Sequence, residues 1–241
     1  MAKIGIIGCG WLGKPLAQNL KKEHTVQCFS RTPQEESELD YVVNPEPHDT
    51  FWKNEIFIFA LSTKDDYLKS LERLVSNCSK DASINLTSST SVYKEFDSEV
   101  NEEALITQAG LQKQAEDLVL NLRENVLILR LGGLMGKDRI AGKWKSPSAY
   151  ADGPVNYIHQ DDVINIVAKM IEKKITSGIF NLVAPLHPLR SDIHQKNAKI
   201  FGFEKKEFNR TTGRFVSSNK LIKALSYKFI HPDPLEFWTT I

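Results

Sequence analysis

Short apolar runs alternate with amphipathic stretches along most of the chain. Runs bounded by polar residues or glycine predict buried strands at 3–8, 25–29, 41–43, 56–61, 83–87, 126–131 and 178–183. Apolar residues at helical spacing predict helices at 12–22, 65–77, 112–123 and 163–174, with two further helical stretches near 191–201 and 217–225. Strands that alternate with helices favour an α/β fold built on a doubly wound, mostly parallel seven-stranded sheet. The Pro-rich, polar stretch 32–55 is the thinnest part of the pattern, and the helix expected there is missing or reduced to a turn.

The clearest candidate chemistry stands between the first predicted strand and the first predicted helix. Gly8-Cys9-Gly10-Trp11-Leu12-Gly13 has the spacing G-x-G-x-x-G, directly after an apolar strand and at the start of an amphipathic helix. In that context the first glycine permits a tight turn, the second lets the backbone approach a pyrophosphate, and the third allows the helix to pack closely on the strand. The pyrophosphate is then held at the positive end of the helix. The motif predicts a Rossmann-type dinucleotide site, and the alternative is a strand–turn–helix without a ligand.

The end of the second predicted strand bears on which nicotinamide cofactor the site takes. An NAD site usually carries an acidic residue about 20 residues past the glycine loop, where it holds the ribose 2′-hydroxyl. This chain instead has Ser30, Arg31 and Thr32 there. A guanidinium with flanking hydroxyls suits a 2′-phosphate, so NADP(H) is favoured over NAD(H); the alternative is a surface arginine in a loop. The remaining cofactor-binding candidates lie at the ends of the fourth and fifth predicted strands or directly after them: Leu61, Ser62, Thr87 and Ser88.

Composition and charge narrow the range of partners. Of 241 residues, 31 are Lys or Arg and 30 are Asp or Glu, so the formal net charge of +1 offers no general field for nucleic acid or anionic lipid. The apolar runs fall short of the ~18 residues of a membrane span, and the first residues lack a signal-peptide pattern. We therefore expect a cytoplasmic protein without nucleic-acid or membrane partners. Cys9, Cys28 and Cys78 are expected to be reduced, buried side chains, and the six scattered histidines predict no metal site.

Further segments resemble the extended and atypical short-chain dehydrogenase/reductase family, the NAD(P)-dependent epimerase and dehydratase group. They occur along the chain in the family's order. Besides the glycine loop they are Leu86-Thr-Ser-Ser-Thr-Ser-Val-Tyr93, Arg130-Leu-Gly-Gly-Leu-Met-Gly136 with Arg139 just beyond, Val155-Asn-Tyr-Ile-His159-Gln-Asp-Asp162, and Phe180-Asn-Leu-Val183. Each motif is short, but their joint order is specific, and the resemblance covers most of the chain.

The resemblance implies a catalytic serine, tyrosine and lysine. The serine corresponds to Ser89, which would hydrogen-bond a substrate hydroxyl or carbonyl; the alternative is a hydroxyl that caps the end of a strand. The family's Tyr-x-x-x-Lys pair is missing, because placing Glu116 at the family's recurrent glutamate puts Gln112 at the lysine position and Gln108 at the tyrosine position. A general acid/base typically contributes about 10²–10⁴ in rate, so hydride chemistry here needs a substitute for the pair.

Tyr93 is the candidate substitute, because it lies four residues beyond Ser89 in the same predicted crevice. The alternative is that Tyr93 packs beneath the substrate loop. His159 is expected to be a structural hydrogen-bonding residue, and Asp161 and Asp162 are expected to cap the helix that follows. Three residues are candidates to line the substrate pocket, namely Thr90, Arg139 and Tyr157.

The resemblance also implies a domain arrangement. Residues 1–183 would form the dinucleotide-binding core, with 137–157 as a substrate-side loop, and residues 184–241 a small cap packed on the core. The length of 241 residues is short for the family, and the deficit falls on the substrate half.

Two functions fit: an NADP(H)-dependent oxidoreductase or epimerase acting on a hydroxyl or carbonyl of a sugar-like small molecule, and a non-catalytic NAD(P)H-binding sensor or interaction module. A homodimer is one expected assembly.

Overall fold

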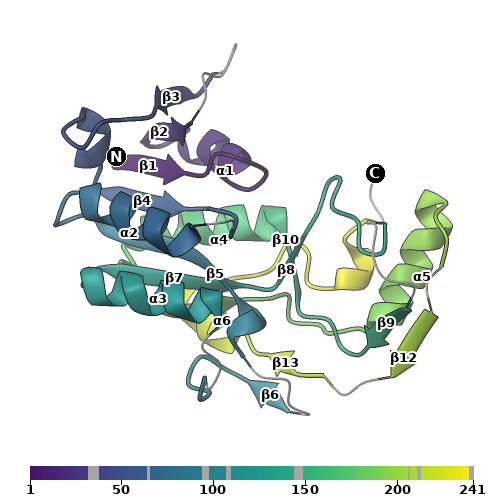
Figure 1. The fold of residues 1–241 in the computed structure, drawn as a ribbon. Coiled ribbons are helices and arrows are strands. Elements are labelled where there is room, and N and C mark those ends of the chain that lie inside the picture. The colour runs from purple at the N-terminus through teal and green to yellow at the C-terminus, as the bar shows by residue number, and fades with distance from the viewer. Residues whose placement is uncertain are drawn as a thin grey trace. The chain divides into compact units, whose positions relative to one another are not determined.

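A seven-stranded sheet with helices between its strands forms the centre of the structure (Figure 1). The computed structural model describes residues 1–31, 38–63, 66–93, 98–106, 110–143, 149–205, 207–210 and 213–238. Its central strands are β1 (Lys3–Ile7), β2 (Thr25–Ser30), β3 (Asp40–Val43), β4 (Ile56–Phe59), β5 (Ser83–Ser89), β7 (Val126–Leu131) and β11 (Gly178–Leu182). The helices are α1 (Gly13–Leu20), α2 (Tyr67–Asn77), α3 (Leu111–Leu122), α4 (Gln160–Glu172), α5 (Arg190–Phe201) and α6 (Asn219–Leu225). Each apolar run predicted as a strand lies in this sheet.

The order of the strands is that of a doubly wound sheet. It runs β11-β7-β5-β4-β1-β2-β3, and the pairings β1–β2, β1–β4, β2–β3 and β4–β5 are parallel. The chain builds outward from β1 to β3, then crosses over to β4 and continues on the other side. In such sheets ligands bind at the carboxyl ends of the strands where this reversal occurs, here between β1 and β4. The predicted α/β fold class is confirmed.

The described chain forms two compact units that interleave along the sequence. Unit 1 comprises Met1–Ser88, Ala109–Leu129 and Val167–Ile179, and unit 2 comprises Ser89–Gln108, Arg130–Ile166 and Phe180–Ile241. The sequence predicts a single boundary after residue 183, whereas unit 2 already includes the segments that follow β5 and β7. Those segments leave the carboxyl ends of the strands, where the fold places its ligand-binding loops.

Unit 1 fills the weakly patterned stretch before β4 with aromatic packing. After β3 the chain forms a short 3₁₀ helix, η1 (Thr50–Lys53), which buries Phe51 and Trp52 in the core. Phe51 meets Phe57 of β4 edge to face, with ring centroids 5.8 Å apart. Helices α2 and α3 lie side by side along the sheet (Figure 1). The helix expected within 32–55 is thus reduced to one turn in the residues described.

Besides the predicted helices α5 and α6, unit 2 contains short elements that the sequence pattern does not predict. Three two-stranded parallel pairs occur: β6 (Glu99–Val100) with β13 (Phe215–Val216), β8 (Gly133–Met135) with β10 (Tyr157–His159), and β9 (Ala149–Asp152) with β12 (Glu207–Arg210). Two 3₁₀ helices, η2 (Thr90–Val92) and η3 (Pro234–Glu236), complete it. One of its buried clusters is formed by Met135, Ile140, Ala141, Val155, Tyr157, Ala184, Ile193, Phe237 and Trp238. Across the described ranges, none of the helices is long and apolar enough to cross a membrane.

Candidate functional site

The glycine loop of unit 1 uses two of its glycines for its own packing. Gly8 follows β1 with φ +101°, and a Cβ there would lie 2.5 Å from the Ala60 carbonyl oxygen. Gly13 begins α1, and a Cβ there would lie 2.2 Å from the Gly8 carbonyl oxygen. A side chain at either position would collide with backbone. The tight turn and the close helix–strand packing predicted for these two glycines are therefore present.

Gly10 differs from the other two because the protein itself does not require it to be glycine. It is exposed, and among the residues that the structure describes a Cβ built on it would meet no atom within 4 Å. Beside it, α1 starts at Gly13 without a side-chain cap and without an acidic residue in its first turn. The first amide groups of a helix lack intrahelical acceptors and attract anions. The bare face of Gly10 at this helix end thus fits a pyrophosphate that approaches the backbone closely, with Trp11 half-buried and Leu12 buried beside it.

The cysteines of unit 1 correct one prediction. Cys9, in the glycine loop, and Cys28, in β2, form a disulfide with their Cα atoms 5.9 Å apart. The parallel register pairs Cys28 with Ile6 of β1, and the Cys9 Sγ turns back to lie 3.7 Å from the Ile6 carbonyl oxygen, so it lies beside Cys28. The prediction that all three cysteines are reduced is wrong for this pair. Cys78 is a free, buried thiol, as expected, and burial raises its pKa to about 12.

The end of β2 presents Arg31 to solvent. Ser30 is the last residue of β2 and is opposite Val43 of β3 in the register. Asn44 holds this turn, because its backbone N–H donates to the Ser30 carbonyl and its side-chain Nδ2 donates to the Arg31 carbonyl, each at 3.0 Å. The carbonyl of Arg31 is thereby fixed while its side chain is exposed. Thr32 lies outside the described residues.

The end of β5 is tied to its neighbours through hydroxyl groups. Thr87 Oγ1 donates to the Phe59 carbonyl of β4 at 2.9 Å. Ser88 Oγ donates to Oε1 of Glu116 in α3 at 2.6 Å, and Glu116 is 1% exposed. These side chains hold the strand end in place beside β4, after which Leu61 is half-buried and Ser62 is exposed. Glu116 is a positioning residue that the motif alignment identifies only as the family's recurrent glutamate.

Ser89, the next residue, begins unit 2 with its hydroxyl in a capping role. Its Oγ accepts a hydrogen bond from the Ser91 backbone N–H at 3.1 Å at the start of η2. Because that bond uses a lone pair of the oxygen, the O–H proton is left to donate. Ser89 is half-buried, and Thr90 after it is buried, with its carbonyl accepting from Arg214 Nη2 at 3.1 Å. The capping alternative and the substrate role are therefore compatible.

Tyr93 is placed where it packs and does not face a crevice. It is 2% exposed. Its hydroxyl donates to Asn181 Oδ1 and accepts from Arg130 Nη1, both at 2.8 Å, and the Arg130 guanidinium lies 5.0 Å from the ring centre. Burial raises the pKa of the phenol although Arg130 opposes the shift. A neutral phenol bonded on both sides is poorly suited to take a proton, so the structure argues against the catalytic assignment and favours the packing alternative.

Two of the three predicted substrate-lining residues also turn out to be buried in the packing. Tyr157 of β10 is 8% exposed and belongs to the buried cluster of unit 2. Its ring fits only because residue 133 is glycine, where a Cβ would lie 2.6 Å from the ring. Thr90 is likewise buried. Arg139 is exposed in the turn that follows β8, and part of the predicted loop 137–157, residues 144–148, lies outside the described residues.

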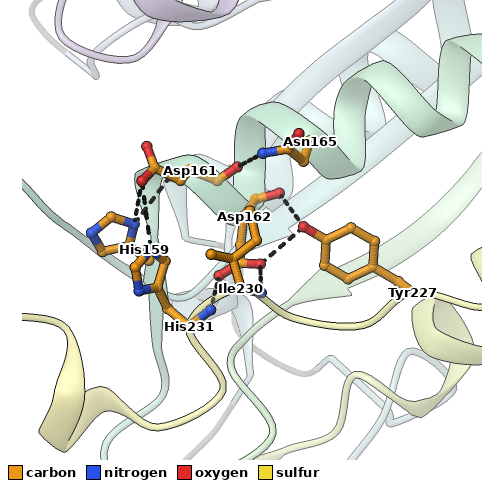
Figure 2. A network of polar contacts seen from close by, with 7 residues as sticks. All are labelled: His159, Asp161, Asp162, Asn165, Tyr227, Ile230 and His231. Atoms are coloured by element: carbon orange, nitrogen blue, oxygen red, sulfur yellow. Dashed lines mark hydrogen bonds and ion pairs between the residues drawn. The ribbon is translucent and has the colours of Figure 1, made fainter.

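A polar network joins the start of α4 to the C-terminal segment of unit 2 (Figure 2). Asp162 is fully buried and accepts hydrogen bonds from the Tyr227 hydroxyl at 2.9 Å, the Ile230 N–H at 2.8 Å and the His231 N–H at 3.0 Å. Burial and the Asp162 carboxylate raise the pKa of Tyr227 above its ordinary value. The prediction that Asp161 and Asp162 cap the helix is wrong, because α4 starts at Gln160 and both residues already lie in its first turn.

His159, at the end of β10, is a buried hydrogen-bonding residue, as expected. Its Nδ1 accepts from the Asp161 backbone N–H at 3.2 Å and lies 3.5 Å from Asp161 Oδ2. Burial, reinforced by His231 nearby, lowers the pKa of His159. The ring is therefore neutral at physiological pH, with a lone pair on the nitrogen that faces Asp161.

Comparisons with known proteins agree with this geometry. The family model for the NAD binding domain of 6-phosphogluconate dehydrogenase matches residues 3–112. Protein YeeZ of Escherichia coli (strain K12) is 28% identical over 269 aligned residues, which cover 98% of each chain.

Solved structures match over nearly the whole chain. A Methylobacillus flagellatus protein described as a candidate NAD-dependent epimerase/dehydratase has a TM-score of 0.80 at 20% identity, covering 99% of this chain and 96% of its own. UDP-glucuronic acid 4-epimerase from Bacillus cereus, in complex with NAD, has a TM-score of 0.77 at 18% identity, covering 98% and 96%. A short-chain dehydrogenase/reductase superfamily protein from Agrobacterium tumefaciens with bound NAD has a TM-score of 0.73 at 15% identity, covering 97% and 94%. The resemblance predicted from the motifs is confirmed at the level of the fold, and residues 3–112 match the model of an NAD binding domain.

Proposed function

We propose that this protein binds NADP(H) through the loop 8–13 and Arg31, and uses it in oxidoreductase or epimerase chemistry on a hydroxyl or carbonyl group. The observation that carries the proposal is the contrast among the three glycines of the loop. Gly8 and Gly13 are required by internal packing, whereas a Cβ on the exposed Gly10 would meet no atom of the described residues within 4 Å. A bare backbone at a helix N-terminus fits a pyrophosphate.

The preference for NADP(H) rests on the end of β2. Arg31 is exposed directly after the strand, and its carbonyl is anchored by Asn44. A guanidinium forms forked, charge-assisted hydrogen bonds with a phosphate group. The chain offers no carboxylate at Ser30, Arg31 or Thr32 to hold a ribose 2′-hydroxyl. Arg31 can therefore bind the 2′-phosphate of NADP(H), a group that NAD(H) does not have.

Titration with the two reduced cofactors tests this preference. NADPH is expected to bind at least about tenfold more tightly than NADH, a difference of about 1.4 kcal/mol. Arg31→Ala should remove the difference and leave the NADH affinity unchanged. Arg73→Ala, which removes an exposed arginine of α2, is the matched control and should keep the preference. Equal affinities for NADPH and NADH in the unmodified protein would refute the assignment.

The chemical part of the proposal rests on Ser89. When bound, the nicotinamide supplies or accepts a hydride. The Ser89 hydroxyl, already accepting from Ser91, can donate its proton to a substrate oxygen and so polarise a carbonyl. Because Tyr93 is buried and the Tyr-x-x-x-Lys pair is missing, we assign the proton transfer to a water molecule.

Substrate screening separates this proposal from its main competitor. NADPH oxidation would be followed with a panel of small carbonyl compounds and nucleotide sugars under single-turnover conditions. Any turnover is expected to be lost in Ser89→Ala. It should be kept in Ser91→Ala, since Ser91 contributes only its backbone N–H to the cap. Unchanged turnover in Ser89→Ala would refute the role of this serine.

A second candidate function is NADP(H) binding without catalysis, as a sensor or interaction module. The specific observation in its favour is the engagement of Tyr93 with Arg130 and Asn181, which argues against a catalytic role for this tyrosine. Tight NADPH binding together with no turnover across the panel would support this candidate over the first.

A further inference from the structure

Two histidines and one carboxylate meet in unit 2 although the sequence separates them widely. His159 ends β10, Asp161 lies in the first turn of α4, and His231 lies in the segment that follows α6. One donor atom of each residue lies within 4.8 Å of the donor atoms of the other two. Figure 2 shows both rings beside the Asp161 carboxylate. None of the three belongs to the cofactor loop or to the Ser89 region.

The distances within the cluster suit ligands of one ion better than direct hydrogen bonds. Asp161 Oδ2 lies 3.5 Å from His159 Nδ1 and 3.5 Å from His231 Nε2. Hydrogen bonds between such atoms usually span about 2.7–3.2 Å. Two ligands on a tetrahedral zinc ion, each about 2.0–2.2 Å from the metal, are separated by roughly 3.3–3.5 Å. The distance from the carboxylate oxygen to each nitrogen therefore matches the distance between two ligand atoms of a tetrahedral zinc site.

The fold holds the donors in this arrangement from both sides. The buried Asp162 carboxylate accepts from the backbone N–H groups of Ile230 and His231 and so fixes the segment that carries the second histidine. Gly136 leaves room for the first ring, since a Cβ there would lie 2.8 Å from His159 Nε2. The Asp161 amide donates to His159 Nδ1 at 3.2 Å, so this nitrogen is the unprotonated one, and a metal ion bound there would take its lone pair in place of that N–H.

The surroundings leave one side of the cluster open. The side chain of His159 is 8% exposed, that of His231 is 26% exposed and that of Asp161 is 49% exposed. Phe237 flanks both rings, with centroids 5.3 Å from His159 and 6.1 Å from His231. Three protein ligands with an apolar wall on one side and solvent on the other leave a position for a water or a small ligand.

We propose that His159, Asp161 and His231 form a three-ligand site for a divalent transition-metal ion of the zinc type. Two imidazoles and one carboxylate favour Zn²⁺, Co²⁺ or Fe²⁺, whereas Mg²⁺ and Ca²⁺ prefer sets composed of oxygen. The ion would link the start of α4 to the C-terminal segment that Asp162 already holds. The site is independent of the NADP(H) proposal, because no residue is shared.

Titration of the full chain with Co²⁺ and Zn²⁺ after chelator treatment tests the site. The unmodified protein is expected to bind one equivalent of Co²⁺ with visible absorption bands that Zn²⁺ displaces. Zn²⁺ should also raise its unfolding temperature, as a ligand of the folded state does. Asp161→Asn and His231→Gln should each weaken binding by more than about tenfold, the lower end of what losing even an outer-shell partner does. Both variants keep the backbone groups that Asp162 and Asn165 contact.

His48→Gln is the matched control, because it removes an exposed histidine of unit 1 outside the cluster. It should bind Co²⁺ as the unmodified protein does. Circular dichroism would establish that each variant is folded before its affinity is compared. The proposal is overturned if the unmodified protein takes up no Co²⁺ at stoichiometric concentration, or if folded Asp161→Asn and His231→Gln bind as tightly as His48→Gln.

Discussion

Alanine at Gly10 and at Gly13 should separate the demands of the fold from the demands of the ligand within one loop. The two glycines are three residues apart and receive the same added methyl group. At Gly13 the new Cβ would lie 2.2 Å from the Gly8 carbonyl oxygen, whereas ordinary van der Waals contact begins at 3.4 Å. At Gly10 the new Cβ would meet no atom within 4 Å in the part of the chain that the structure describes. The loop thus contains its own control.

The expected free energies follow from these contacts. An overlap of more than 1 Å against backbone should cost Gly13→Ala about 1–3 kcal/mol of unfolding free energy or more. Alanine at Gly10, whose φ lies outside the left-handed range, should leave stability unchanged or raise it by about 0.4–1 kcal/mol, because it restricts the unfolded chain. The methyl group at Gly10 nevertheless occupies the bare face at the helix end. NADPH should therefore bind to Gly10→Ala at least about tenfold more weakly, a loss of about 1.4 kcal/mol.

Urea unfolding and NADPH titration measured on both variants provide the assay. The expected outcome is a crossed pattern, with stability lost at Gly13 and cofactor affinity lost at Gly10. The reasoning is refuted if Gly10→Ala binds NADPH as the unmodified protein does, because the open face would then have no ligand against it. It is equally refuted if Gly13→Ala is as stable as Gly10→Ala.

Three further outcomes are expected. Tyr93→Phe should lower the free energy of unfolding by about 1–3 kcal/mol in urea, since it removes the buried hydroxyl that accepts from Arg130 and donates to Asn181, while NADPH affinity is unchanged; an intact stability would contradict the packing role. Cys9 and Cys28 are 19 residues apart in the sequence, so reduction of their disulfide should lower the free energy of unfolding by about 3 kcal/mol. The variant with serine at both positions should show no response to reductant. Burial lowers the pKa of His194 to about 4, whereas the unfolded chain takes up this proton near pH ~6.5. The contribution of the neutral ring to the free energy of unfolding is therefore full above pH ~6.5, and up to about 3 kcal/mol of it is lost as the pH drops toward 4. His194→Gln should flatten that part of the pH profile.

The sheet could be predicted because its signal is local. A run such as Ile56–Phe59 is apolar at every position, as a parallel strand covered on both faces must be. The glycine loop was equally accessible, because its meaning depends on the strand before it and the helix after it. The small strands of unit 2 carry no such signal. Phe215–Val216 is too short for a period and pairs with Glu99–Val100, more than a hundred residues earlier in the chain.

The candidate site was predicted where residue type determines the role and missed where the role depends on contacts. The phenol of Tyr93 is chemically able to transfer a proton, but its hydroxyl forms hydrogen bonds with Arg130 and Asn181, two residues from later strands. Asp162 reads as a helix cap until the segment that contains Tyr227 is placed beside it. The disulfide needed the register of β1 and β2, which spacing alone does not supply.

The division into two units has a consequence for how such a protein can diversify. The chain passes between the units after residues 88, 108, 129, 166 and 179. Neither unit is encoded by one contiguous stretch of the gene, so recombination that exchanges a single segment cannot transplant unit 2 onto another Rossmann domain. Changes in specificity must instead accumulate by substitution and by insertion in the loops that follow the carboxyl ends of the strands. Residues in those loops can therefore be lost or replaced, and the chemistry altered, while the glycine loop stays unchanged.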